Sequence, residues 1–351
     1  MEMEQSTPDR AESTVTSASE TPTTLPQMQP RRRPQPRNWR WPLGLFLTTL
    51  VTLYYAWFQW GWKSGQYALT GVPDLWTDGC IYALSLVAIL GAHEMGHFLQ
   101  AVRYRVPASF PYFLPMPFNP FGTMGAVINM RIDRANRRQL FDIGISGPLA
   151  GLVVCIPLLW YGLWISTPIK APQMYGEPLF WKFSVWLIHG SDAVAPGMVV
   201  PMNPISMAGW VGLFVTGLNM MPFGQLDGGH ITYLLFGRRA SFLGWAVLGG
   251  SVLYMWWTRN ETMGLMLLLL LFMGPDHPRT ADEQDADYAV WWYRLFTRNP
   301  EPQEMEEDEE FPLEYPDGPV PLGRVRTVLG YVSLAIPLLC LTPTPLVSLT
   351  F

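Results

Sequence analysis

The segment from Cys80 to Val102 is an apolar run that contains the sequence His-Glu-Met-Gly-His at residues 93–97. Its length and composition are those of a helix that spans a lipid bilayer. In a helix, residues i and i+4 lie on one face, so His93 and His97 can bind the same metal ion. A carboxylate and two imidazoles are costly inside a membrane unless they have a function. A soluble core helix with hydrogen-bonded histidines is the alternative.

The composition favours a membrane protein. Of the 351 residues, 49% are hydrophobic and only 15% are charged, whereas soluble domains carry about a quarter charged residues. The 16 Trp and 14 Tyr residues fit the aromatic belts at the two membrane surfaces. The three cysteines form no Cys-x-x-Cys pair, so we interpret them as packing residues rather than a disulfide framework or a zinc-thiolate site.

The apolar runs predict an all-α polytopic membrane protein with about seven transmembrane helices. We expect these helices at about residues 41–60, 80–102, 141–165, 205–230, 241–257, 262–274 and 327–347. The expected parts are a disordered cytosolic tail with a basic end (1–40), a membrane domain (41–274) with a catalytic core at about 80–240, a polar acidic cytosolic segment (275–326) and a C-terminal transmembrane helix (327–351).

The segment from Phe110 to Met130 cannot form a regular helix, because it has four prolines between residues 111 and 120. Residues 122–130 are typical of a short strand. We therefore expect a re-entrant β-hairpin beside the active site, since irregular backbone at that depth is tolerated against protein or water. Its edge can pair with an extended substrate, which makes Gly122, Gly125 and Asn129 candidate substrate-binding residues. A surface loop with apolar packing is the alternative.

A third metal ligand is available near residue 227. Pro222 and its neighbouring glycines break the fourth expected helix, which places Asp227 on irregular backbone near membrane depth. Asp227 is thus the natural oxygen ligand for zinc held by His93 and His97. Asn219 can orient a substrate carbonyl or cap the helix break. For His230 we favour a capping or packing role over hydrogen bonding to a ligand.

The arginines predict the orientation. With the N-terminus inside, those at 103–105, 131–138, 238–239, 279 and 324–326 all fall on the cytosolic side. His93, His97 and Asp227 then all lie at cytosolic ends of their helices. We expect a multi-pass integral membrane protein with its N-terminus and active site toward the cytosol, in the inner membrane of a bacterium. The arginines at 31–33 precede a span, so we expect no nucleic-acid partner.

Three protein ligands and one open position are typical of a catalytic zinc, so we expect one Zn²⁺ per chain with Glu94 as the catalytic base. The favoured function is an intramembrane zinc endopeptidase. The alternatives are a non-proteolytic membrane metal-binding or transport protein, and an inactive protease relative that binds membrane partners. A transporter should carry more polar residues in its spans or show inverted repeats, and the intact Glu94 speaks against an inactive relative.

The chain resembles the site-2 protease family of intramembrane zinc metalloproteases. The resemblance rests on His93-Glu94-Met95-Gly96-His97 and on residues 219–228, which fit the pattern Asn-x-x-Pro-x-x-x-Leu-Asp-Gly; weaker similarities are residues 122–126 and 147–151. It implies a three-helix core, zinc on His93, His97 and Asp227, Glu94 as base, and single-span membrane regulators as substrates of regulated intramembrane proteolysis in the lipid bilayer. The loop at 166–204 is too short for a PDZ domain, which needs about 80–100 residues.

Overall fold

The structure, a computed structural model, describes residues 40–63, 75–130, 134–173, 175–258 and 321–342. These residues belong to one unit of the chain, Trp39–Phe351. The expected N-terminal tail, apart from Arg40, lies outside the described residues. So do the expected sixth span and the acidic run at 304–310.

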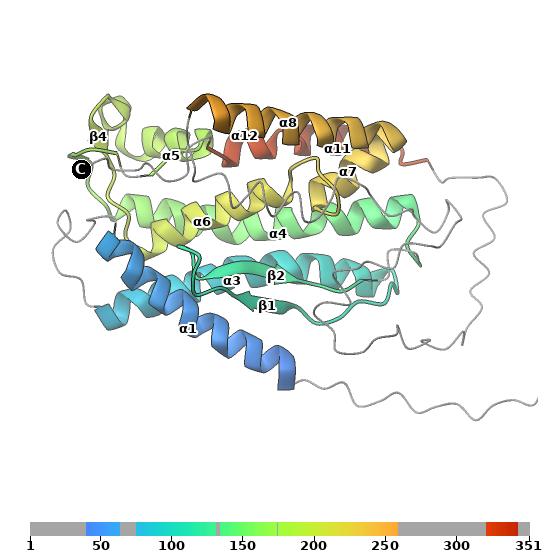
Figure 1. The fold of residues 1–351 in the computed structure, drawn as a ribbon, viewed down its shortest axis with the longest axis horizontal. Coiled ribbons are helices and arrows are strands. Elements are labelled where there is room, and N and C mark those ends of the chain that lie inside the picture. Colours follow the sequence, from blue (N-terminus) through green and yellow to red (C-terminus); the bar gives the residue numbers. More distant parts are fainter. Residues whose placement is uncertain (1–39, 64–74, 131–133, 174, 259–320, 343–351) are drawn as a thin grey trace, which may run out of the picture. The chain divides into compact units, whose positions relative to one another are not determined.

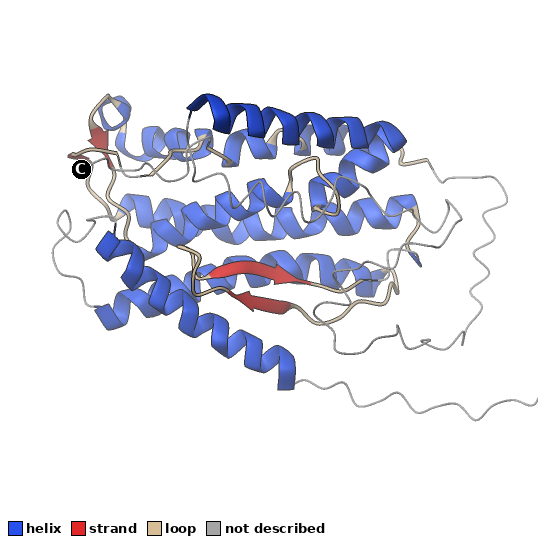
Figure 2. Cartoon of the chain, in the orientation of Figure 1, coloured by secondary structure: helices blue, strands red, loops and turns tan. Residues whose placement is uncertain are grey.

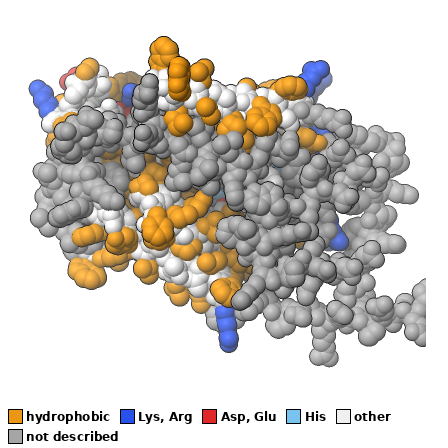
Figure 3. All heavy atoms as spheres, in the orientation of Figure 1, with side chains coloured by type: hydrophobic (Ala, Val, Ile, Leu, Met, Phe, Trp, Pro, Cys, Tyr) orange, Lys and Arg blue, Asp and Glu red, His pale blue; other side chains and the backbone are white. Residues whose placement is uncertain are grey.

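Three of the described helices are long and apolar enough to cross a membrane: α1 (Arg40–Lys63), α3 (Leu75–Arg103) and α4 (Arg137–Trp164). They contain the first two expected spans, and α4 covers the third except for its last residue, Ile165. Helix α3 packs against α1 and against α4 (Figure 1). Apolar side chains gather on the face of the molecule that Figure 3 shows, and residues such as Val153 and Trp164 of α4 are largely exposed, as expected for contact with lipid.

Helix α4 starts four residues before the expected span. Asn136 caps it: its side-chain oxygen accepts from the Gln139 backbone N–H at 2.9 Å, and the Gln139 side-chain oxygen accepts from the Asn136 backbone N–H at 3.0 Å. This reciprocal pair satisfies donors that a helix start leaves free. Arg137 and Arg138 therefore belong to the helix rather than to the preceding loop.

A β-hairpin lies among the helices (Figure 2). Its strands are β1 (Tyr112–Pro115) and β2 (Thr123–Val127), which pair antiparallel with Phe113 opposite Ala126. The hairpin packs on α1 and α3. Gly122 has φ +84°, and an added Cβ atom there would lie 2.6 Å from the Thr52 carbonyl oxygen of α1, so only glycine permits this approach. The depth of the hairpin in a bilayer stays a prediction.

The fourth expected span is divided into α6 (Pro204–Asn219) and α7 (Asp227–Phe236). Asn203 caps α6 and Pro204 opens it, an arrangement that favours a helix start. The chain leaves the helix after Asn219, and Pro222 lies in the break, as the sequence predicts. Helix α6 packs on both α3 and α4. A short 3₁₀ turn, η3 (Gly237–Arg239), leads into α8 (Ala240–Thr258).

The segment between α4 and α6 is more ordered than the plain loop that we expected. It contains a two-stranded sheet, an α-helix and a 3₁₀ turn: β3 (Ile169–Lys170), α5 (Leu179–His189), η2 (Ser191–Val194) and β4 (Met198–Val199). Trp181 of α5 is fully buried and packs edge-on against Tyr175. Buried aromatic packing therefore anchors this segment to the helical core.

The last described part of the chain is two short helices rather than one long one. Helix α11 (Arg324–Ser333) contacts α4 and α7, and α12 (Ile336–Cys340) contacts α5 and α6. Pro337 lies at the start of α12. Proline has no backbone N–H, and its ring clashes with the carbonyl four residues earlier, which is that of Ser333. The expected continuous helix from residue 327 is therefore interrupted, and residues 343–351 lie outside the described part.

Candidate metal centre

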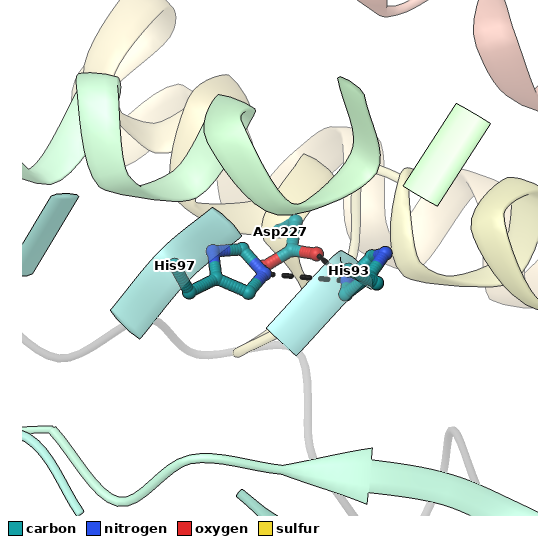
Figure 4. Close-up of side chains that lie close together, drawn as sticks. All are labelled: His93, His97 and Asp227. Atoms are coloured by element: carbon teal, nitrogen blue, oxygen red, sulfur yellow. Dashed lines mark hydrogen bonds and ion pairs between the residues drawn. The ribbon is translucent and has the colours of Figure 1, made fainter. Parts of the chain in front are cut away.

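Two helices far apart in the sequence bring three potential metal ligands together (Figure 4). Nε2 of His93 lies 3.2 Å from Oδ2 of Asp227, and Nε2 of His97 lies 3.3 Å from Oδ1 of the same carboxylate. The two Nε2 atoms are 3.2 Å apart. All three side chains offer a ligand atom within 4.8 Å of the others. The sequence predicted these residues at a similar depth in the membrane, and in the structure their side chains lie next to one another.

The ring of His97 is oriented by α4. Its Nδ1 lies 2.7 Å from the backbone carbonyl oxygen of Ile143. A carbonyl oxygen only accepts, so Nδ1 carries the hydrogen and Nε2 of the neutral ring presents a lone pair to the Asp227 carboxylate. Two acceptors that face each other in a buried site suit a shared cation, and a backbone carbonyl on the second nitrogen is the usual support of a metal-binding histidine.

Small residues of α4 make room for both histidines. An added Cβ atom at Gly147 would lie 2.1 Å from Nε2 of His97, and one at Gly151 would lie 3.2 Å from Cβ of His93. Ser146, directly before Gly147, donates from Oγ to the Gly96 carbonyl oxygen at 2.9 Å. Small residues thus let α4 approach α3 closely and lie directly against the candidate metal ligands.

The loop before α7 holds Asp227 in place. Asp227 is the first residue of α7, and the backbone of residues 220–226 folds back over the next two residues. An added Cβ atom at Gly228 would lie 2.0 Å from the Met220 carbonyl oxygen, and one at Gly229 would lie 2.2 Å from the Gly224 carbonyl oxygen. Glycine at both positions is therefore required for the tight turn that presents the carboxylate.

Two further polar residues lie at the cluster. Glu94 is only 6% exposed and lies close to His97 and Asp227. The side-chain amide nitrogen of Asn219, the last residue of α6, lies 3.3 Å from Nε2 of His93. His230 is buried in α7, and its role stays open between packing and hydrogen bonding.

The three hairpin residues that we predicted to bind substrate have contacts of a different kind. Gly122 packs on α1, as described above. Gly125 lies within β2 with φ +95° and has open space where a Cβ would be, and its N–H donates to Thr123 Oγ1 at 3.0 Å. The backbone of Asn129 makes two hydrogen bonds with Ser109: its carbonyl oxygen accepts from the Ser109 N–H, and its N–H donates to Ser109 Oγ. Their substrate role stays a prediction.

Some residues near the site have no signal in the sequence. Ile143 contacts His97 through its backbone carbonyl oxygen. Any residue has such a carbonyl, so the sequence does not indicate this contact. Asp142 accepts hydrogen bonds from Tyr104 and Arg326, and Arg326 is 184 residues away. A single aspartate near the start of an apolar run suggests that a basic side chain pairs with it, but the sequence does not identify that side chain.

Comparison with known proteins agrees with this geometry. The model of peptidase family M50 matches residues 81–244, a range that includes both histidines, Glu94 and Asp227. Over this range the chain is similar to peptidase family M50. Among curated relatives, "Probable zinc metalloprotease EGY2, chloroplastic" of Oryza sativa subsp. indica is 31% identical over 218 residues, which cover 58% of this chain and 38% of the relative.

Other relatives carry similar names. "Probable zinc metalloprotease EGY1, chloroplastic" of Arabidopsis thaliana is 33% identical over 190 residues, which cover 50% of this chain and 34% of that protein. The EGY2 protein of Arabidopsis thaliana is 28% identical over 219 residues, 58% of this chain and 37% of the relative. The chain thus spans less than two fifths of the length of these curated relatives. No solved structure matches it.

Proposed function

We propose that this protein is an intramembrane zinc endopeptidase of the M50 type, which hydrolyses peptide bonds of transmembrane substrates in regulated intramembrane proteolysis. The observation that carries the proposal is the convergence of His93, His97 and Asp227. Ligand atoms about 2.0–2.1 Å from a tetrahedral zinc ion lie about 3.3–3.4 Å from one another. The 3.2 Å between the two Nε2 atoms fits that spacing, and the Asp227 carboxylate lies 3.2 Å from His93 through Oδ2 and 3.3 Å from His97 through Oδ1. The names of the curated relatives also support zinc.

The chemistry follows from the groups at this point. Zinc bound by the three residues would supply positive charge, which lowers the pKa of water and polarises a peptide carbonyl. Glu94 accepts a proton from the attacking water and passes it to the leaving amine nitrogen. Its burial keeps bulk water away from the proton that it carries. The Asn219 amide lies beside His93, where it can donate to the carbonyl oxygen of the substrate.

The proposed substrates are single-span membrane proteins. A transmembrane helix hides its peptide bonds, so a substrate must unwind before the water can attack. In the part of the chain that the structure describes, β2 pairs with β1 alone, which leaves its other edge for an extended segment of substrate.

The location of the protein is also a proposal. Three long apolar helices and the similarity to peptidase family M50 support association with a membrane. The relatives are described as chloroplastic, so they lend no support to a bacterial inner membrane. That location and the cytosolic orientation stay predictions from the arginine pattern.

One experiment separates this function from its alternatives. Wild type and Glu94→Gln are purified, their zinc content is measured, and both are incubated in liposomes with single-span model substrates. We expect equal zinc in both proteins and cleavage by wild type alone. Zinc in wild type without cleavage would instead support a membrane metal-binding protein or an inactive relative, and equal cleavage by the variant would remove Glu94 from the mechanism.

A further inference from the structure

The first two turns of α4 form a junction of four elements. Asp142 accepts two hydrogen bonds from Arg326 of α11, from Nε to Oδ1 and from Nη2 to Oδ2, each of 2.7 Å. Such a two-point guanidinium–carboxylate pair is stronger and more directional than a single contact. The Tyr104 hydroxyl, just beyond the end of α3, donates to the same carboxylate. Hydrogen bonding to Asp142 raises the pKa of the Arg326 guanidinium, so the pair stays charged at neutral pH.

The junction is connected to the metal centre through one peptide unit. Asp142 precedes Ile143, whose carbonyl oxygen accepts from Nδ1 of His97. Tyr104 is seven residues after His97, and its backbone N–H still bonds to the Gln100 carbonyl oxygen, so the two side chains lie on the same face, two turns apart. Two hydrogen bonds on one face therefore connect the α3 region to α4: His97 to the Ile143 carbonyl oxygen, and Tyr104 to the Asp142 carboxylate.

The other metal-binding helix is tied to the same turns. Arg137 donates from Nη2 to the Leu234 carbonyl oxygen of α7 at 2.6 Å, and Asp227 begins that helix. Arg138 donates from Nε to the Pro321 carbonyl oxygen at 2.7 Å, just before α11. The start of α4 thus holds α3, α7 and the C-terminal segment together. Arg326 and Pro321 lie outside residues 81–244, the range that the family model matches.

We propose that Arg326 is a positioning residue for the metal centre: by holding Asp142 it sets the first turns of α4, and with them the carbonyl that orients His97. The C-terminal segment is then part of the metal-binding unit rather than an appended anchor. This inference rests on the proposed metal site. Residues that support a metal-binding histidine typically cost about 10–100-fold in metal affinity when they are lost. Because Arg326 acts one step further out, we place its effect at about tenfold.

The test is a titration of the metal-free full-length protein in detergent with Co²⁺, followed by the visible absorption of the bound ion, whose bands report ligand geometry. The variants are Arg326→Gln and Asp142→Asn, and the matched control is Arg324→Gln, an exposed arginine of the same helix. We expect Co²⁺ binding about tenfold weaker, with shifted bands, in Arg326→Gln. The control should titrate as wild type does.

A stabilising tether without a positioning role gives a different result. If Arg326 only stabilises the fold, Arg326→Gln melts at a lower temperature than wild type, but the folded variant keeps the Co²⁺ affinity and the absorption bands of wild type. That result would overturn the inference. If Arg326→Gln does not fold, Asp142→Asn decides, because it removes the charge and keeps the shape: unchanged bands and affinity overturn the inference there too. Failure of wild type to bind Co²⁺ and Zn²⁺ would instead refute the proposed function.

Discussion

His97 Nδ1 lies 2.7 Å from the carbonyl oxygen of Ile143, so the backbone of α4 orients a ring whose other nitrogen faces Asp227. The metal centre is therefore a product of three helices, although only two of them supply its ligands. Helix α4 supplies the carbonyl that orients His97 and the glycines that leave room for the two imidazole rings. Its surface therefore matters to the site as much as the ligand residues do.

Gly147→Ala should abolish metal binding. The new methyl group would lie 2.1 Å from Nε2 of His97, so the ring must leave its position. The measurement is zinc content after purification, and we expect near-complete loss. Gly249→Ala is the control: that glycine is also helical, in α8, and has open space where its Cβ would be. Normal zinc content in Gly147→Ala would mean that His97 does not bind the ion in this position.

Asp227→Ala should lower the zinc occupancy of the purified protein, because it removes the only oxygen ligand of the cluster. His189→Ala is a suitable control, since His189 bonds to the Leu163 carbonyl oxygen at the far end of α4 from Ile143. We expect the control to keep its zinc. Full retention of zinc by the Asp227 variant would reject that residue as a ligand.

Gly122→Ala should destabilise the hairpin more than Gly190→Ala does. Both glycines have a φ close to +84°, but an added Cβ atom meets the Thr52 carbonyl oxygen only at Gly122 and meets nothing within 4 Å at Gly190. The positive φ costs each variant about 1–2 kcal/mol, and overpacking adds about 1–3 kcal/mol at Gly122. Thermal unfolding in detergent measures the difference. Equal losses would show that the hairpin moves away from α1 freely.

We expect the stability of the protein to depend on pH through the carboxyl group of Glu177. Burial raises the pKa of its carboxyl above the ordinary value, with Lys182 only partly opposing the rise. The folded state therefore prefers the protonated form, and stability is lost as the pH rises from the ordinary carboxyl pKa through the raised one. Glu177→Gln should be more stable than wild type at neutral pH, with the gain vanishing in acid. A gain that does not change with pH would exclude this cause.

The sequence predicted that the side chains of His93, His97 and Asp227 come together, because the signals that indicate this are local. The spacing of His93 and His97 and the break at Pro222 follow from helix geometry and from the missing N–H of proline. The close approach of Gly147 and Gly151 to α3 was seen only in the structure. Long-range polar pairing was beyond reach, because nothing near Asp142 or Arg326 in the chain identifies the other.

The sequence was less informative about the ends and interruptions of helices. The start of α4 depends on the reciprocal bonds of Asn136 and Gln139, which an apolar run does not show. The break before α12 follows from a single proline within an otherwise apolar segment, where we expected a continuous span. Helix α5 was missed because its aromatic residues resemble an interfacial loop, whereas Trp181 is in fact buried in the core.

Metal removal and restoration tests the central claim most directly. The purified protein is stripped with a chelator, returned to liposomes with a single-span model substrate, and titrated with Zn²⁺ while cleavage is measured. We expect no cleavage by the stripped protein and full recovery at one zinc ion per chain. Cleavage that survives complete removal of the metal, or recovery that occurs equally in Asp227→Ala, would contradict the catalytic zinc centre built here from His93, His97 and Asp227.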